Sequence, residues 1–203
     1  MTGHRDAALP TGAATLVVIA KEPVPGLVKT RLTPEYTREE AAALAEAALA
    51  DTLHTVRSLP ARRRLLVLEG RPGPWLPSPG FEVVPQVGAG LDERLAHAFA
   101  ACSGPTLLIG MDTPQVSRAL LAPALAPDAW DRADAWFGPS EDGGFWALGL
   151  AAPTPLCCAA SRCRPRTRAG SSASGSSARD CAWATWRGSP TSTPRATPPS
   201  WRR

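Results

Sequence analysis

The chain has 203 residues, of which 44% are hydrophobic, enough for one domain with a proper core but short for two. No apolar run is long enough to cross a membrane, and residues 1–12 lack the apolar segment of a secretory signal. We therefore expect a cytoplasmic protein with a flexible leader over residues 1–12 and no membrane partner. The net charge of +4 is uneven, because residues 153–203 hold nine arginines and one acid, a net +8, which leaves −4 for residues 1–152. This mildly acidic body argues against a general nucleic-acid surface.

The first element is a short, β-branched apolar run, residues 15–20, which predicts a strand buried on both faces. A basic loop follows it, in which two prolines and Gly26 exclude a continuing strand or an immediate helix. Its cations Lys21, Lys29 and Arg31 can face one anionic ligand at the carboxyl end of the strand. A Walker motif is excluded, because valine and not glycine precedes Lys29. The alternative is an ordinary surface loop with solvated charges.

The next elements alternate between helix and strand. Thr37 and Glu40 form a capping-box pattern, which predicts the start of an alanine-rich helix over about residues 38–58. Residues 64–69 and 81–84 are predicted strands, and residues 91–102 a helix. Between the last two lies a shaped loop that contains Gln86, Gly88 and Gly90. Its glycines can let the backbone approach a flat ligand closely, although two spaced glycines alone are a weak signal.

Two acid-bearing turns follow strands in the second half of the domain. Residues 106–110 are a predicted strand that runs directly into Asp112, where a carboxylate can hold a divalent cation bridging to a diphosphate. The alternative role of Asp112 is to cap the next helix. Glu141 and Asp142 precede a Gly-Gly pair, and one of them can act as a second metal ligand or a general base. Their alternative is a plain hairpin turn, since Asp-Gly is a strong turn dipeptide.

The order of elements predicts the fold class. A short proline-containing helix over residues 117–126, a strand over residues 133–137 and another over residues 145–150 complete the series. Apolar strands that alternate with helices predict a three-layer α/β, Rossmann-like domain with a mostly parallel sheet over residues 13–152.

Four ordered stretches of the sequence resemble the motifs of one family. They are Ala20–Leu32, Gln86–Leu95, Ile109–Pro114 and Gly138–Leu148. The family is a small bacterial group of GT-A-like glycosyltransferases within the nucleotide-diphospho-sugar transferase superfamily. It is related to the molybdopterin and phospholactate guanylyltransferases. Four motifs in order over about 130 residues are a specific signal.

The resemblance implies a site that binds a nucleotide sugar or an NTP together with Mg²⁺ or Mn²⁺. In this picture Lys21, Lys29 and Arg31 contact phosphates, and Asp112 stands at the position of the family's metal-binding aspartate. The loop from Gln86 to Gly90 would lie near the base, and Asp142, with Glu141, would be the acid on the side of a small-molecule acceptor. Glycosyl transfer is the function that we expect. Nucleotidyl transfer is the alternative, and an inactive, binding-only product is a third interpretation.

Residues 153–203 differ from the rest of the chain and from the family. They contain one leucine and no Val, Ile, Phe, Met or Tyr, so we expect a low-complexity, basic, disordered tail. GC-rich codons for residues 180–194, read in another frame, give a family-like ending with a V-D-T-P turn. The hypothesis is therefore that this tail is an out-of-frame translation and that a C-terminal element is missing. The competing interpretation is a genuine basic arm for nucleic acid or acidic partners.

Overall fold

The computed structural model describes residues 12–77, 79–140, 144–153 and 183–186. In chain order its elements are β1 (Thr15–Lys21), the 3-10 helix η1 (Thr30–Leu32), α1 (Arg38–Ser58), β2 (Arg63–Glu69), β3 (Glu82–Pro85), α2 (Leu91–Ala100), β4 (Thr106–Gly110), α3 (Arg118–Leu125), α4 (Ala129–Arg132), β5 (Ala135–Pro139), β6 (Phe145–Leu150) and β7 (Trp183–Thr185). No helix among these residues is both long and apolar enough to span a bilayer.

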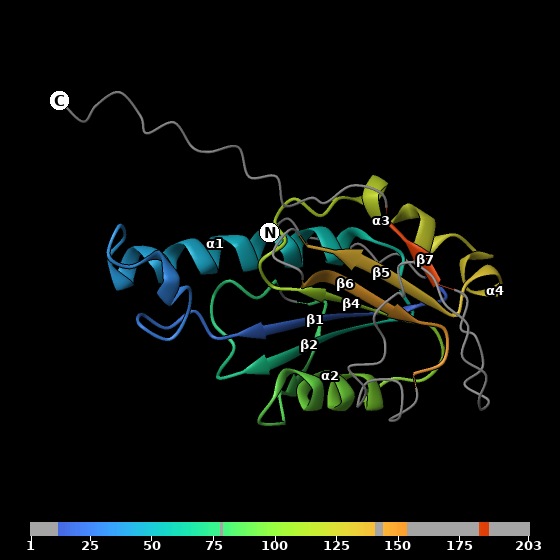
Figure 1. Ribbon diagram of the computed structural model, residues 1–203, viewed down its shortest axis with the longest axis horizontal. Coiled ribbons are helices and arrows are strands. Elements are labelled where there is room, and N and C mark those ends of the chain that lie inside the picture. The colour runs from blue at the N-terminus through green and yellow to red at the C-terminus, as the bar shows by residue number, and fades with distance from the viewer. Residues whose placement is uncertain (1–11, 78, 141–143, 154–182, 187–203) are drawn as a thin grey trace, which may run out of the picture.

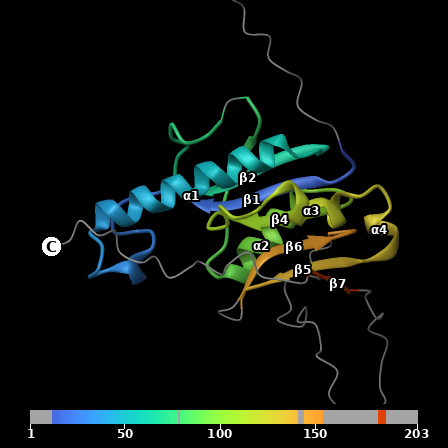
Figure 2. The ribbon, with the colours of Figure 1, turned by 90° about the horizontal axis from the view of Figure 1, so that it is seen from above.

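A seven-stranded sheet in the order β3-β2-β1-β4-β6-β5-β7 forms the centre of the molecule (Figures 1 and 2). The pairs β2–β3, β1–β2, β1–β4 and β5–β7 are parallel, whereas β6 runs antiparallel to both β4 and β5. The predicted α/β class with a mostly parallel sheet is confirmed. The antiparallel insertion of β6 was not predicted, because strand order depends on pairings between distant segments.

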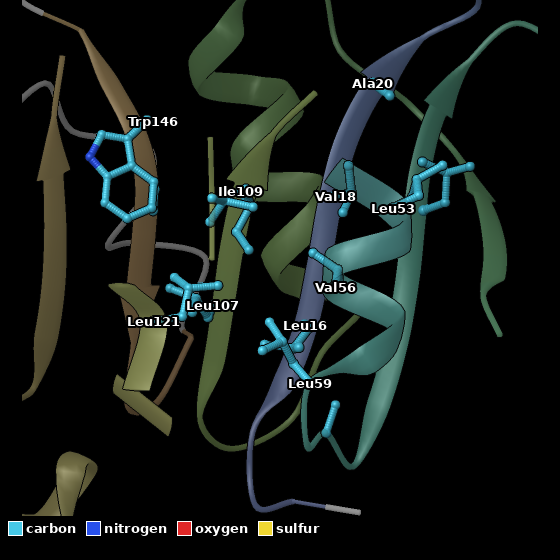
Figure 3. Packing of buried hydrophobic residues seen from close by; sticks show 14 of the residues in the cluster. Leu16, Val18, Ala20, Leu53, Val56, Leu59, Leu107, Ile109, Leu121 and Trp146 are labelled. Carbon is cyan, nitrogen blue, oxygen red and sulfur yellow. The ribbon is translucent and has the colours of Figure 1, made fainter. Parts of the chain in front are cut away.

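Helices cover both faces of the sheet, so the domain has three layers. Figure 1 shows α1 and α3 on one side of the sheet and α2 on the other. Alternate residues of β1 serve the two sides: Leu16 and Val18 pack with Leu53 and Val56 of α1 (Figure 3), whereas Val17 joins the cluster of α2. Each fully buried side chain of this size contributes about 1.5–3 kcal/mol to folding.

Side-chain hydrogen bonds define both ends of α1. At its start the Thr37 hydroxyl accepts from the Glu40 N–H at 3.1 Å, and the Glu40 carboxylate accepts from the Thr37 N–H at 2.8 Å, so the predicted capping box is confirmed. At its end the buried guanidinium of Arg64, on β2, donates to the carbonyls of Val56 and Leu59. Burial lowers the pKa of Arg64 from its ordinary value.

Two local differences from the predictions lie around the β5 edge. Ala129–Arg132 form the short helix α4, and β5 begins at Ala135 and not at residue 133. Four residues are too few for a hydrophobic period to reveal a helix in the sequence. The predicted helix over residues 117–126 is α3, with the Ser117 hydroxyl accepting from the Leu120 N–H at its start.

The segment after residue 153 is only partly covered. Within it, Trp183–Thr185 pair with β5 and Trp186 is 5% exposed, which the expectation of a disordered tail did not include for these four residues. Trp186 lies 5.2 Å from Trp136 and 5.0 Å from Trp146, measured between ring centroids, and its Nε1 donates to the Leu120 carbonyl at 2.9 Å. The Trp186 ring thus supplies buried apolar area from a segment that has almost no large aliphatic residues. Residues 154–182 and 187–203 lie outside the described residues, and the out-of-frame origin stays a hypothesis.

Candidate functional site

One edge of the sheet gathers the ends of four central strands. In register, Ile19 of β1 lies beside Val67 of β2 and Gly110 of β4, so these parallel strands end together. β6 runs the other way, with Ala147 beside Ile109, so its first residues lie at the same edge. In Figure 1 the arrowheads of β1 and β2 point to this edge. Loops at the carboxyl ends of strands are where open α/β sheets bind ligands.

A cavity of about 360 Å³ opens at this edge. Apolar side chains form much of its wall, and two of them, Leu27 and Leu91, are mostly exposed. The polar residues that line it are Lys21, Lys29, Gln86, Arg94 and Asp112. A mixed wall of this kind, apolar with a few convergent polar groups, is typical of small-molecule sites. Four of the five polar residues are predicted site residues, and the structure brings them together.

An ion pair joins the loop after β1 to the turn after β4. Lys29 Nζ lies 2.9 Å from Asp112 Oδ1, and the two side chains are 23% and 56% exposed. The turn that carries Asp112 is held by backbone and side-chain bonds. The Met111 N–H donates to the Ile19 carbonyl at 3.1 Å, and the buried Thr113 hydroxyl donates to the Gly110 carbonyl at 2.6 Å. The carboxylate therefore projects from a well-anchored segment.

Lys29 itself has an unusual backbone conformation. Its φ of 46° and ψ of 36° are left-handed, directly before η1. This conformation costs a non-glycine residue about 1 kcal/mol or more, and such outliers concentrate at functional sites.

A second cavity of about 330 Å³ adjoins the first. It is lined by Lys29, Thr30, Arg31, Leu32 and Asp112, so Lys29 and Asp112 line both cavities. The structure thus places Lys29, Arg31 and Asp112 at one edge, as the sequence predicted. Gly26, with a φ of 81°, lines a third cavity of about 260 Å³ that shares Val28 with the first and Thr30 with the second, and its contact with a ligand stays a prediction.

Glu69, at the end of β2, was not predicted as a site residue. Its Oε2 accepts from Lys21 Nζ at 3.1 Å, from Arg94 Nη1 at 3.0 Å and from Gln86 Nε2 at 3.0 Å. Arg94 was missed as well, although it lies within a stretch that carries the family resemblance. Their positions in the sequence could have indicated both residues. Glu69 is the last residue of a predicted strand, and Arg94 is in the first helical turn after the glycine loop.

The glycine loop has a structural explanation of its own. Gly88 has a φ of 124°, and a Cβ there would lie 2.7 Å from the Cβ of Glu93, so only glycine fits. The Gly88 carbonyl accepts from Arg94 Nε at 3.0 Å, and the Glu93 carboxylate accepts from the Ala89 N–H at 2.8 Å. These contacts start α2, whose N-cap is Gly90. Neither Gly88 nor Gly90 lines the two adjoining cavities, so their approach to a flat ligand stays a prediction.

The side chains that could bind the predicted metal are few. Within the described part of the chain, no three His, Cys, Asp or Glu side chains cluster as a preformed metal site. Asp112 is the carboxylate among the described residues that line the two cavities. One carboxylate fits Mg²⁺ or Mn²⁺ that takes its other ligands from substrate phosphates and water. Glu141 and Asp142 lie outside the described residues, and the flanking Ser140 N–H donates to the Gly144 carbonyl at 3.1 Å.

The charges around the two cavities favour an anion. Among the described residues that line the two cavities, Lys21, Lys29, Arg31 and Arg94 are positive and Asp112 is negative, and Glu69 pairs with two of these cations from beside the larger cavity. This local excess contrasts with the net charge of −4 of residues 1–152. A concave site of one sign raises the local concentration of ligands of the opposite sign.

The fold is that of the nucleotide-diphospho-sugar transferases. A protein of Desulfovibrio desulfuricans G20 that is provisionally named as such a transferase matches with 27% identity and a TM-score of 0.59, over 70% of this chain and 64% of its own length. This chain thus spans less than two thirds of the length of that protein. The chain belongs to the family described as "Uncharacterized protein conserved in bacteria (DUF2064)", whose model matches residues 52–161. That match includes Glu69, Gln86, Arg94 and Asp112, and it begins after the basic loop.

Two further solved structures show weaker likeness. One is 2-C-methyl-D-erythritol 4-phosphate cytidylyltransferase from Thermus thermophilus, 20% identical over 70% of this chain and 71% of that chain, with a TM-score of 0.40. The other is the manganese complex of Rv0371C from Mycobacterium tuberculosis H37Rv, 19% identical over 72% and 74% of the two chains, with a TM-score of 0.42. No curated protein matches the chain.

Proposed function

We propose that the protein is a metal-dependent glycosyltransferase that uses a nucleotide-sugar donor and a small-molecule acceptor. The observation that carries the proposal is the meeting of Lys29, Arg31 and Asp112 around two adjoining cavities at the carboxyl ends of the strands. The likeness to a protein named as a nucleotide-diphospho-sugar transferase supports the donor class. Residues 13–152 would form the transferase domain of a cytoplasmic enzyme.

In this proposal the diphosphate of the donor lies where the two cavities meet. Lys21, Lys29 and Arg31 bind its oxygens and stabilise the negative charge that develops on the departing nucleoside diphosphate. Asp112 would hold Mg²⁺ or Mn²⁺, which when bound would supply a Lewis acid for the leaving diphosphate. The larger cavity has the apolar wall that a nucleobase needs, and Gln86 lies within it.

The residues that activate the acceptor are the least defined part of the proposal. Asp142 is the proposed acid or base, with Glu141 as its neighbour, and both belong to the segment that joins β5 to β6. The strands on either side end at the same edge as Asp112, since Ala147 of β6 pairs with Ile109 of β4.

Nucleotidyl transfer is the second candidate. The same cations and the same carboxylate can hold an NTP, with pyrophosphate as the leaving group. A binding-only product is the third, and it follows from the hypothesis that residues 153–203 are translated out of frame.

Product analysis separates these candidates. The full chain is incubated with Mg²⁺ or Mn²⁺ and with labelled sugar nucleotides or NTPs, and released nucleoside diphosphate and pyrophosphate are measured. We expect nucleoside diphosphate from a sugar nucleotide. Pyrophosphate from an NTP would establish the second candidate instead, and tight binding without either product the third. Asp112→Asn serves as the control, because it keeps the side-chain shape but removes the charge.

A further inference from the structure

We infer that Lys29 is an internal counter-ion that occupies the metal-binding carboxylate of Asp112 until a nucleotide phosphate draws the ammonium away. The metal would then bind after the nucleotide and not before it. The inference deepens the proposed function and rests on it in naming a nucleotide as the ligand and Asp112 as the carboxylate that holds the metal.

The position of the ion pair supports this role. The ammonium lies 2.9 Å from Asp112 Oδ1, and these two residues line both adjoining cavities. A ligand that spans the two cavities therefore passes the pair. A phosphate at that point would meet the cation and the carboxylate together, and only the cation attracts it.

The pair is also one that a ligand can exchange. The Asp112 side chain is 56% exposed and that of Lys29 is 23% exposed, so water screens the pair from the side of Asp112 and reduces its net stability. Lys29 has a flexible stem and a compact ammonium, which binds phosphate as a point charge.

Lys21 and Lys29, the two lysines that line the larger cavity, pair with carboxylates that have different numbers of other donors. Lys21 shares the Glu69 carboxylate with Arg94 and Gln86, so Glu69 keeps two donors if Lys21 leaves. In the part of the chain that the structure describes, the recorded partner of the Asp112 carboxylate is Lys29. Withdrawal of Lys29 leaves Asp112 as a carboxylate in need of a cation, beside phosphate oxygens that a metal also prefers.

Calorimetry with Mn²⁺ alone tests the inference on the full chain without nucleotide. Lys29→Met removes the competing cation, so we expect its affinity for Mn²⁺ to exceed that of the unmodified protein by about three- to tenfold. Lys21→Met is the matched control. It removes the same charge from the same cavity, but Lys21 pairs with Glu69 and not with Asp112. We expect its affinity for Mn²⁺ to stay within about twofold of the unmodified protein. Equal gains in the two variants, or no gain in Lys29→Met, would overturn the inference.

Two additions make the result decisive. Lys29→Gly removes the cation with a residue that adopts a φ of 46° without strain, so it replaces Lys29→Met if that variant fails to fold. Repeating the titration with nucleoside diphosphates should raise the affinity of the unmodified protein for Mn²⁺ by about tenfold, and that of Lys29→Met by less. If no nucleotide binds, the proposed function fails, and the comparison with Mn²⁺ alone still decides the role of Lys29.

Discussion

The two ends of β2 hold charge in opposite ways. Near its start, Arg64 is 6% exposed, and its guanidinium is bound to carbonyls of the last turn of α1. At its end, the Glu69 side chain is 45% exposed, and its carboxylate is shared by three donors from the cleft. Arg64 is bound to backbone carbonyls, which are fixed by the fold. Glu69 is bound to side chains, which can change partners when a ligand binds.

This difference separates a structural charge from a functional one on a single strand. A buried ion whose partners are fixed contributes to folding only while all of its bonds are made. A half-exposed carboxylate that holds lysine and arginine is screened by water, so a ligand can take its partners at little cost. We therefore expect variants at the buried end to change stability and variants at the open end to change binding.

The largest expected effect is a loss of stability on removal of Trp186, which follows the outermost strand β7. Trp186, like Arg64, is buried. Trp186→Ala removes the ring contacts with Trp136 and Trp146, so the free energy of unfolding should fall by about 3–5 kcal/mol. Urea denaturation measures it. Trp186→Phe, which keeps an aromatic ring but loses the bond to the Leu120 carbonyl, should cost about 1 kcal/mol. A Trp186→Ala protein as stable as the unmodified chain would show that β7 does not pack on the sheet.

The next effect tests the buried end of β2 itself. Arg64→Met removes the side-chain donor of the Leu59 carbonyl and leaves the Val56 carbonyl with the Leu59 N–H, so we expect a loss of about 2–3 kcal/mol in the free energy of unfolding. Arg63→Met is the matched control. Arg63 is on the same strand and pairs with the exposed Glu82 at 2.7 Å, and its loss should cost under about 1 kcal/mol. Equal costs in the two variants would remove the distinction between buried and exposed charge.

The smallest effect is expected at the open end. Glu69→Gln keeps the size of the side chain but frees Lys21 and Arg94 from a competing carboxylate. The affinity for a nucleoside diphosphate should then rise by about two- to threefold, while the free energy of unfolding changes by under about 1 kcal/mol. Calorimetry and urea denaturation measure the two quantities. A marked loss of affinity would mean that Glu69 positions the cations and does not compete with the ligand.

Local signals in the sequence were enough for most of the elements. The capping box and the alanine-rich pattern gave the bounds of α1, and the short apolar runs gave β4 and β6, because each of these signals lies within the element. The meeting of Lys29 with Asp112 was predictable too, since the carboxyl ends of parallel strands share one edge of a sheet.

What the sequence did not predict depends on contacts between distant residues. Burial of Arg64 requires the carbonyls at the end of α1, and the role of Glu69 requires three donors from three other segments. The packing of Trp186 requires two tryptophans of β5 and β6, which no pattern within residues 153–203 reveals. The roles of Glu141 and Asp142 stay predictions.

The affinity of the protein for a nucleoside diphosphate, measured with and without Mn²⁺ on the unmodified chain and on Asp112→Asn, tests the central claim most directly. We predict that Mn²⁺ raises the affinity of the unmodified chain by about tenfold and has no effect on Asp112→Asn, because the proposed metal would be held by this carboxylate and by the diphosphate. Equal nucleotide and Mn²⁺ affinities in the two proteins would contradict a transferase site at this edge of the sheet.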